Sequence, residues 1–351
     1  MIKKKFIDIN GLGHSGKGAI SDLLREVKGV HLYDHLFEFD LVRISGGLID
    51  LKHNILDYWS PIRANTAIKK FIDVSTRMSK SDYRSVGHKI NSYGTDYESI
   101  FNNNFLNETH NYINNLISYK VRRKFWPYNL IDKSTTYLFF YKLLRKLNMH
   151  HKVYKNHNEY LIIDRENFLR HTHNYFNNLF SHMNITEAND TIILHNTLEP
   201  YDTIKGIDII PNLKVINVIR DPRDTYASTL TNKNVYIPSY ISDPQQWIIK
   251  QNFLGTENIN EYIKIQKMQL DNYIKQDHHK ILNLKYEDIV LNYEDTKTKI
   301  FNFLKIDESL HIDKKKFFDP ELSKSNVGIW KRFSDLKEIK KINKELNKFY
   351  L

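Results

Sequence analysis

A glycine-rich segment near the start of the chain, residues 11–18 (GLGHSGKG), contains residue types that bind phosphate. Backbone N–H groups of such a turn, together with the positive end of a following helix, hold a phosphate without needing a particular side chain. The segment matches the first part of the phosphate-loop pattern G-x-x-x-x-G-K-(S/T), from Gly11 to Lys17. Gly18 stands where that pattern carries a magnesium-binding hydroxyl. The segment predicts a phosphate site and argues against a magnesium-dependent kinase or triphosphatase.

A second candidate anion site lies in the segment VIRDPRDTYAS. Arg220 ends an apolar run, and Ser228 follows eight residues later, about two helical turns into the next segment. The paired donors of an arginine and the hydroxyl of a serine can converge on one phosphate. The alternative interpretation is a surface arginine paired with Asp221 or Asp224.

The third candidate segment is SKSNVGIWKRF, close to the end of the chain. Gly328 permits a close approach of the backbone to a ligand. Lys324, Lys331 and Arg332 place positive charge beside Trp330. Basic loops with an aromatic residue are usually solvated surface, so the meaning of this segment depends on the other two.

The elements that must position these residues follow an α/β pattern. A strand over residues 5–10 precedes the first loop, and SGKGAISDLLREV has apolar residues at helical spacing. The segment GVHLYDHLFEFDLVR supplies a second strand and its loop, so a βαβ unit begins here. The segments DTIILHN and LKVINVIR predict two further strands of the buried kind. Asp221 is a plausible N-cap of the following helix, with Pro222 at its first position.

The rest of the chain divides into an insertion and a C-terminal part. Residues from about 45 to 185 are rich in Asn, Lys, Tyr and His and predict a mostly helical insertion, which we expect to shape the acceptor site. Further on, HHKILNLKYEDIV predicts a strand and a turn, YEDTKTKIFNFLKI an amphipathic helix, and the final Lys/Glu-rich segment a solvated surface helix. We expect an α/β protein with a parallel β-sheet flanked by helices, as in phosphate-loop proteins. Residues 1–351 form one expected domain, with a nucleotide-binding core at about 1–43 and 190–335.

Composition limits the compartment and the partners. The formal net charge of +11 favours an anionic partner, such as a nucleotide, a polyanionic glycan, nucleic acid or an acidic membrane. The absence of cysteine excludes disulfides, thiolate zinc sites and cysteine nucleophiles. No apolar stretch approaches the ~20 residues that span a bilayer, and the basic N-terminus is too short in apolar residues for a signal peptide. We expect a soluble, cytoplasmic protein.

The three segments, in this order, resemble the sulfotransferases that use 3′-phosphoadenosine 5′-phosphosulfate (PAPS). In that family a loop of the type Lys/Arg-Ser-Gly-Thr-Thr holds the 5′-phosphosulfate. A strand ending in Arg, with Ser eight residues later, holds the 3′-phosphate, and a C-terminal basic loop with a G-x-W-K-like core closes over the nucleotide. The segment LKYEDIVLNYEDTKTKIFNFLKI also resembles the family. The likeness covers residues 1–43 and 190–335.

The resemblance implies a set of residues that bind the nucleotide. They are Gly13, Ser15, Gly16, Lys17, Gly18, Arg220, Ser228, Gly328, Trp330, Lys331 and Arg332. Aligned on the family loop, His14 stands where the catalytic Lys or Arg is found, while Lys17 and Gly18 replace the two threonines. Both Lys17 and His14 are therefore candidates for the catalytic cation, and Lys17 is favoured because its charge is permanent.

Sulfuryl transfer also needs a base that takes the proton of the acceptor hydroxyl. Family members that act on glycans often use a Glu in the loop after the second strand, and Glu38 lies at about that position. Asp34 and His35 are runners-up, and His195 is a further candidate at the end of a strand. The alternative for Glu38 is a structural pair with Arg43.

The expected reaction moves a sulfuryl group from PAPS to a hydroxyl acceptor, a carbohydrate or small molecule, and releases adenosine 3′,5′-bisphosphate. The resemblance implies no metal, and no nucleic-acid partner is expected. Two alternatives remain: a phosphate-loop nucleotide kinase, and a non-catalytic polyanion-binding protein on a degenerate nucleotide fold.

Overall fold

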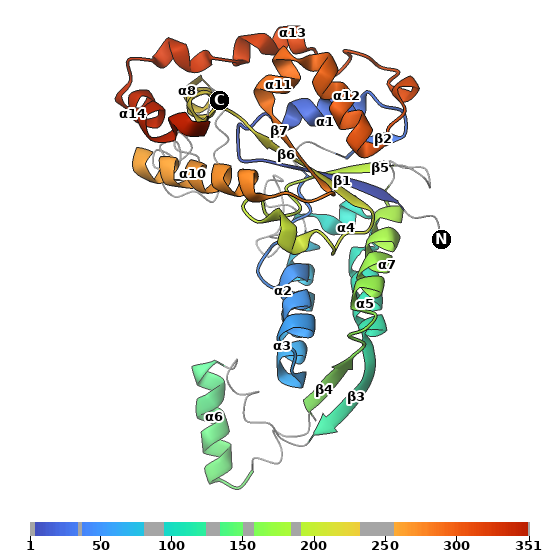
Figure 1. The fold of residues 1–351 in the computed structure, drawn as a ribbon. Helices are drawn as coiled ribbons and strands as arrows, with labels where there is room; N and C mark the ends of the chain where they lie inside the picture. Colours follow the sequence, from blue (N-terminus) through green and yellow to red (C-terminus); the bar gives the residue numbers. More distant parts are fainter. Residues whose placement is uncertain are drawn as a thin grey trace.

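A five-stranded parallel sheet lies at the centre of the protein (Figure 1). The computed structural model describes residues 4–33, 37–80, 95–123, 134–149, 158–183, 191–231 and 256–349. In order across the sheet, the strands are β2 (Val30–Leu32), β5 (Thr191–His195), β1 (Lys5–Asn10), β6 (Leu213–Ile219) and β7 (Ile281–Lys285). The predicted α/β class and parallel sheet are confirmed, and the strand predicted at residues 5–10 has those bounds.

The nearly continuous apolar character of the strands has a direct cause, because both faces of the sheet are covered. On β1, Phe6 belongs to one buried cluster, while Ile7 and Ile9 belong to the cluster on the opposite face. On β5, Ile192 and Ile193 divide in the same way. Successive side chains of a strand point to opposite faces, so a strand buried on both faces must be apolar throughout.

Three groups of helices surround the sheet. One face is covered by α1 (Lys17–Arg25), α11 (Tyr286–Leu291), α12 (Tyr293–Leu304) and the short α13 (Pro320–Ser323). A second group, with its own buried cluster, comprises α8 (Pro222–Thr231), α10 (Ile259–Lys275) and α14 (Lys337–Leu346). The opposite face packs against helices of the insertion, which are α2 (Leu48–Lys52), α3 (Pro61–Met78), α4 (Tyr97–Ile100), α5 (Phe105–Leu116) and α7 (Phe168–Ser181).

The insertion extends away from the sheet as an arm (Figure 1). Helices α3, α5 and α7 form its base, and the antiparallel pair of β3 (Ile117–Arg123) and β4 (Asn158–Ile163) continues it outward. Helix α6 (Thr135–Lys146) lies at the far end. Within the described residues, no helix has both the length and the apolar character needed to cross a bilayer.

Two local predictions were wrong. The turn predicted after β7 is the helix α11, whose Ile289 and Val290 are buried against α1 and α12. The final helix, α14, is not simply solvated, because Ile339 and Ile342 are buried against α8 and α10. In both cases burial of an apolar side decided the outcome, and in α14 the Lys/Glu-rich composition of the other side concealed it.

A buried carboxylate ties the C-terminal segment to α1. Glu26, which is fully buried, accepts hydrogen bonds from the backbone N–H groups of Lys315, Phe317 and Phe318 at 2.9 to 3.1 Å. Its carboxylate also bonds to Nε2 of the buried His311 at 2.7 Å. The segment that leads into residues 324–333 is therefore anchored to the helix that follows the first loop.

Candidate active site

The glycine-rich loop joins β1 to α1 and forms a cradle with unused donors. Gly16 has φ of 85°, and a Cβ at this position would lie 2.2 Å from the ring of Tyr286, so only glycine fits. It precedes α1 without any side-chain cap, which leaves the first N–H groups of the helix available. Within the described part of the chain, the buried Oγ of Ser15 has no hydrogen-bond partner. A phosphate would satisfy these donors.

Lys17 and Glu38, both predicted catalytic residues, are brought together at the mouth of this loop. Lys17 Nζ lies 2.8 Å from Glu38 Oε1. Arg43 donates to Glu38 Oε2 at 2.7 Å, so the alternative pair with Arg43 is also present. The backbone near Glu38 is held by the hydroxyl of the buried Tyr97, which donates to the Glu38 carbonyl at 3.0 Å. A cation and a potential proton acceptor therefore converge on one point.

His14, the other candidate cation, is in a different situation. Its backbone has φ of 61°, in the left-handed region, and its carbonyl accepts a hydrogen bond from Arg220 Nη1 at 3.3 Å. Burial, and next the charge of Arg220, lower the pKa of His14 below its usual value of 6.5. The imidazole is neutral at pH 7, and the permanent charge of the loop is that of Lys17.

Arg220 lies where the sequence placed it, at the end of β6, and it joins three segments. Its Nη1 donates to Ser228 Oγ on α8 at 2.8 Å, and its Nη2 donates to the carbonyl of Asn326 at 2.5 Å. The guanidinium also stacks on the ring of Tyr286, 4.8 Å from its centroid. Its buried Nε has no partner within the described residues. The alternative of a surface arginine is wrong, because Arg220 is buried.

The two aspartates beside Arg220 have other roles. Asp221 caps α8, accepting from the N–H of Arg223 at 2.8 Å, as predicted for this position. Asp224 accepts from the N–H groups of Gly328 and Trp330 at 2.6 and 3.0 Å. The guanidinium of Arg223 lies 4.1 Å from the centroid of the Trp330 ring. The C-terminal segment is thus fixed over α8 next to Arg220. The sequence did not predict this role of Asp224 in positioning the segment.

Asn196 is a second residue that sequence reasoning missed. It follows β5 with φ of 43°, a conformation that asparagine tolerates better than most residues. Its Oδ1 accepts from the N–H of Gly11 at 3.0 Å, and its Nδ2 donates to Glu38 Oε1 at 2.9 Å. Asn196 therefore links the start of the phosphate loop to the carboxylate. Its only signal was its place at the carboxyl end of a strand.

The remaining predicted residues lie at the rim of the site or elsewhere. Gly13, Lys331 and Arg332 are exposed, and a side chain at Gly18 would meet no atom within 4 Å. Lys324 pairs with Glu321 at 2.8 Å. His195 is buried and bonds to Ser21 Oγ at 2.6 Å. Asp34 and His35 lie outside the described residues.

A family model decides what these elements belong to. The model of the sulfotransferase domain matches residues 94–329, which is more than half of the chain. The chain belongs to the sulfotransferase family. The match includes Arg220, Ser228 and Gly328 but begins after the glycine-rich loop, so the assignment of that loop to a phosphate depends on its geometry.

Solved sulfotransferase structures are similar to this sulfotransferase only at low identity. The sulfotransferase domain of the Synechococcus olefin synthase is 12% identical, with 97% of this chain and 94% of that chain covered and a TM-score of 0.41. The corresponding domain of the curacin biosynthetic pathway is 12% identical, with 99% of each chain covered and a TM-score of 0.39. A Mycobacterium tuberculosis sulfotransferase is 9% identical, with 93% and 77% covered and a TM-score of 0.37. No curated protein sequence matches the chain significantly.

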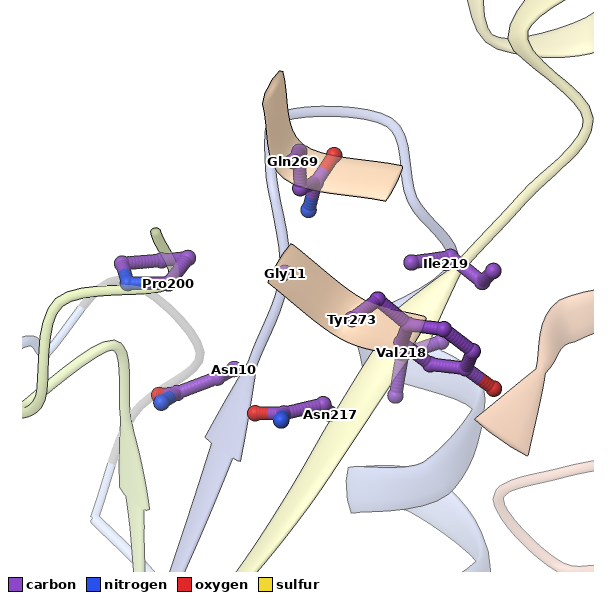
Figure 2. A pocket seen from close by; sticks show the side chains of 8 residues that line it. All are labelled: Asn10, Gly11, Pro200, Asn217, Val218, Ile219, Gln269 and Tyr273. Carbon is purple, nitrogen blue, oxygen red and sulfur yellow. The ribbon is translucent and has the colours of Figure 1, made fainter. Parts of the chain in front are cut away.

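Behind the loop of this sulfotransferase is a small pocket (Figure 2). It lies where β1 and β6 end and faces α10. Its lining residues carry no charge; they are Asn10, Gly11, Pro200, Asn217, Val218, Ile219, Gln269 and Tyr273. Neither Lys17 nor Arg220 is among the residues that line it. Among the described residues, no group of three or more His, Asp or Glu side chains is placed to hold a metal.

Asp8 supports the turn that carries Asn196. It is fully buried on β1, and its two carboxylate oxygens accept from the N–H groups of Thr197 and Leu198 at 3.0 and 2.9 Å. Burial raises the pKa of Asp8 from 3.8 to about 6, although the two backbone N–H groups act in the opposite direction. The carboxylate is therefore ionised at pH 7 at a cost to stability.

This cost predicts a pH dependence of stability. Because the folded-state pKa of Asp8 is above its unfolded value, the folded protein binds more protons than the unfolded chain between pH 6 and 3.8. Its contribution to the free energy of unfolding thus falls, by about 3 kcal/mol, as the pH rises from below 4 to 7. Urea unfolding of the wild type and Asp8→Asn between pH 4.5 and 7.5 should give different slopes against pH. Parallel profiles would show that Asp8 does not titrate in this range.

Proposed function

We propose that the protein transfers a sulfuryl group from PAPS to a hydroxyl acceptor, and that the acceptor is a carbohydrate. The observation that carries this proposal is the position of Arg220. One guanidinium nitrogen, Nη1, contacts both Ser228 on α8 and the carbonyl of His14 in the glycine-rich loop. The glycine-rich loop and the Arg220–Ser228 pair are therefore adjacent. Two adjacent anion sites suit a nucleotide that carries phosphates on both the 3′ and the 5′ position of its ribose.

The residues present fit such a nucleotide. The unpartnered Ser15 Oγ, with Gly16 and the first N–H groups of α1, would hold the 5′-phosphate. Arg220 and Ser228 would hold the 3′-phosphate, since Arg220 Nε is buried without a partner in the described chain. Gly328 and Trp330, with Lys331 and Arg332 beside them, would close over the nucleotide. When bound, PAPS supplies the activated sulfuryl group.

The side chains of this protein then have distinct tasks. Glu38 takes the proton of the acceptor hydroxyl while the oxygen of that hydroxyl forms the new bond to sulfur. Lys17 stabilises the negative charge that collects on the 5′-phosphate as the old sulfur–oxygen bond breaks. Asn196 and Arg43 orient the Glu38 carboxylate through the hydrogen bonds described above. The neutral His14 contributes its carbonyl to the placement of Arg220. We propose that no metal takes part in these steps.

A carbohydrate acceptor is supported by the positive charge of the protein and not by its aromatic residues. Most aromatic side chains near the base of the arm form a buried cluster, as Phe39, Tyr97, Phe101 and Phe176 do, so they cannot stack on sugars. The net charge of +11 favours an acidic acceptor. The acceptor and the cytoplasmic location stay predictions. Transfer of label from PAPS to a panel of neutral and acidic glycans, lipids and tyrosine peptides tests the acceptor class.

Nucleotide binding can be tested before the acceptor is known. Adenosine 3′,5′-bisphosphate, without magnesium and at about 100 times its Kd, should stabilise the folded protein by about 2.7 kcal/mol and raise its Tm by several degrees. The measurement is a thermal denaturation scan, with adenosine 5′-monophosphate as the matched ligand that lacks the 3′-phosphate. Stabilisation by ATP with magnesium and none by the bisphosphate would favour the nucleotide-kinase alternative.

A further inference from the structure

Helix α6 lies at the far end of the arm (Figure 1). It exposes an unusual number of large apolar side chains. The exposed fractions of Phe139, Phe140, Leu143 and Leu147 are 65%, 56%, 45% and 58%. These four residues, here called the α6 apolar face, have no role in the sulfotransferase site, which lies at the sheet. Apolar groups exposed together mark an interaction surface more often than isolated ones do.

The spacing of these residues places them on one side of the helix. Phe139, Leu143 and Leu147 follow at intervals of four residues, and Phe140 lies beside them on the next row. The rings of Phe139 and Phe140 contact each other edge to face, with centroids 6.0 Å apart. The helix is capped by Ser134, whose Oγ accepts from the N–H of Tyr137, so it begins as a defined helix at the arm tip.

The charges of α6 point to the nature of the partner. Its three charged residues, Lys142, Arg145 and Lys146, are all basic and exposed. At 3.6 residues per turn, Lys142 and Lys146 flank the α6 apolar face, while Arg145 lies on the opposite side of the helix. None of the ion pairs found within the described residues involves them, so their charge is available.

An apolar face could bind a second copy of the protein or a membrane, and the charges beside it distinguish these two partners. A second copy docked through its own α6 would bring Lys142 and Lys146 of both copies together and would be repelled. An anionic lipid surface instead attracts the cations and accepts the apolar side chains. Phe and Leu on one side with Lys and Arg beside them is the pattern of helices that lie in the membrane interface.

We propose that α6 docks the protein on an anionic membrane surface, with the α6 apolar face inserted among the lipids and Lys142 and Lys146 at the headgroups. The proposal does not depend on the sulfuryl donor or on the acceptor. The arm would then hold the enzyme at a lipid surface, a role that is separate from sulfuryl transfer.

Vesicle sedimentation of the full-length protein tests the proposal. The protein should sediment with phosphatidylcholine vesicles that contain phosphatidylglycerol, and less so as the salt concentration rises. The triple variant Phe139→Ser/Phe140→Ser/Leu143→Ser should lower the partition coefficient by about tenfold or more. The matched control is Ile274→Ser/Leu291→Ser/Leu322→Ser, which removes three equally exposed apolar residues elsewhere and should leave binding unchanged.

A second pair of variants tests the contribution of the positive charges of α6. Lys142→Gln/Arg145→Gln/Lys146→Gln should weaken binding to anionic vesicles more than Lys337→Gln/Lys340→Gln/Lys344→Gln, which removes as many charges from α14. All these residues are exposed, so the Tm of each variant should match that of the wild type.

The absence of cysteine permits a direct measurement of insertion. A polarity-sensitive fluorophore on Leu143→Cys should brighten and shift to the blue with anionic vesicles, while one on Leu322→Cys should not respond. Equal binding to uncharged vesicles, or equal loss in the control variants, would overturn the proposal. A dimer that the Phe139/Phe140/Leu143 variant dissociates, seen by sedimentation velocity, would show instead that a second copy covers α6.

Discussion

Replacement of Lys17 by alanine is expected to lower kcat by about 10³-fold, because one preorganised charge at a developing anion has an effect of this order. The ammonium of Lys17 lies 2.8 Å from Glu38 at the mouth of the loop, and its side chain is only 20% exposed. The charge is therefore partly shielded from water. The measurement is the steady-state rate of label transfer from PAPS to the acceptor that the panel identifies.

His14→Gln is the matched control for this experiment, because His14 and Lys17 are the two candidates for the catalytic cation. The pKa of His14 is lowered by burial, so a neutral amide should preserve most of its function, and we expect less than about a tenfold loss in kcat. Lys17→Ala should also raise the Kd for adenosine 3′,5′-bisphosphate, because the 5′-phosphate of this ligand carries the charge that Lys17 faces, whereas His14→Gln should change this Kd little. A large loss in His14→Gln with a small loss in Lys17→Ala would make the imidazole the catalytic cation.

The second large effect concerns nucleotide affinity. Arg220→Ala should raise the Kd for adenosine 3′,5′-bisphosphate by about 10²- to 10³-fold, because it removes charge-assisted hydrogen bonds from a buried phosphate site. Ser228→Ala, which removes one neutral hydroxyl, should raise it by about tenfold. Isothermal titration calorimetry measures both values, and Arg25→Ala at the far end of α1 is the control.

Folding must be separated from binding in Arg220→Ala, since this side chain also joins three segments of the protein. Arg220→Lys keeps the charge but loses the paired donors, so its affinity should be intermediate. A comparison of the affinity for adenosine 5′-monophosphate isolates the 3′-phosphate, because that ligand should be affected less. Equal losses for the two nucleotides would show that Arg220 does not contact the 3′-phosphate.

Features that depend on a few neighbouring residues could be predicted from the sequence. The strand before the glycine loop, the helix after it, and the cap formed by Asp221 and Pro222 are local, and each was correct. The Arg220–Ser228 pair was also predictable, because both residues lie on consecutive elements at a spacing that brings them together. Periodicity and spacing carry this information within one strand and one helix.

The polar network that orients the site could not be predicted in this way. Asn196 bonds to Gly11 and Glu38, Asp8 to the turn after β5, and Asp224 to Gly328. Each bond joins residues that are about one hundred or more positions apart in sequence. No local sequence pattern around a single Asn or Asp indicates which distant residue it will bond to. These side chains become neighbours only because of the order of the strands in the sheet.

The sequence by itself therefore determined the fold class, the family resemblance and the two segments that we propose bind the phosphates. The tertiary structure decided that the pKa of His14 is lowered, by burial and next by the charge of Arg220. It also decided that aromatic residues of the arm base form a core, while Phe139 and Phe140 of α6 remain exposed. Burial is a property of the whole packed chain, so no short segment could reveal either result.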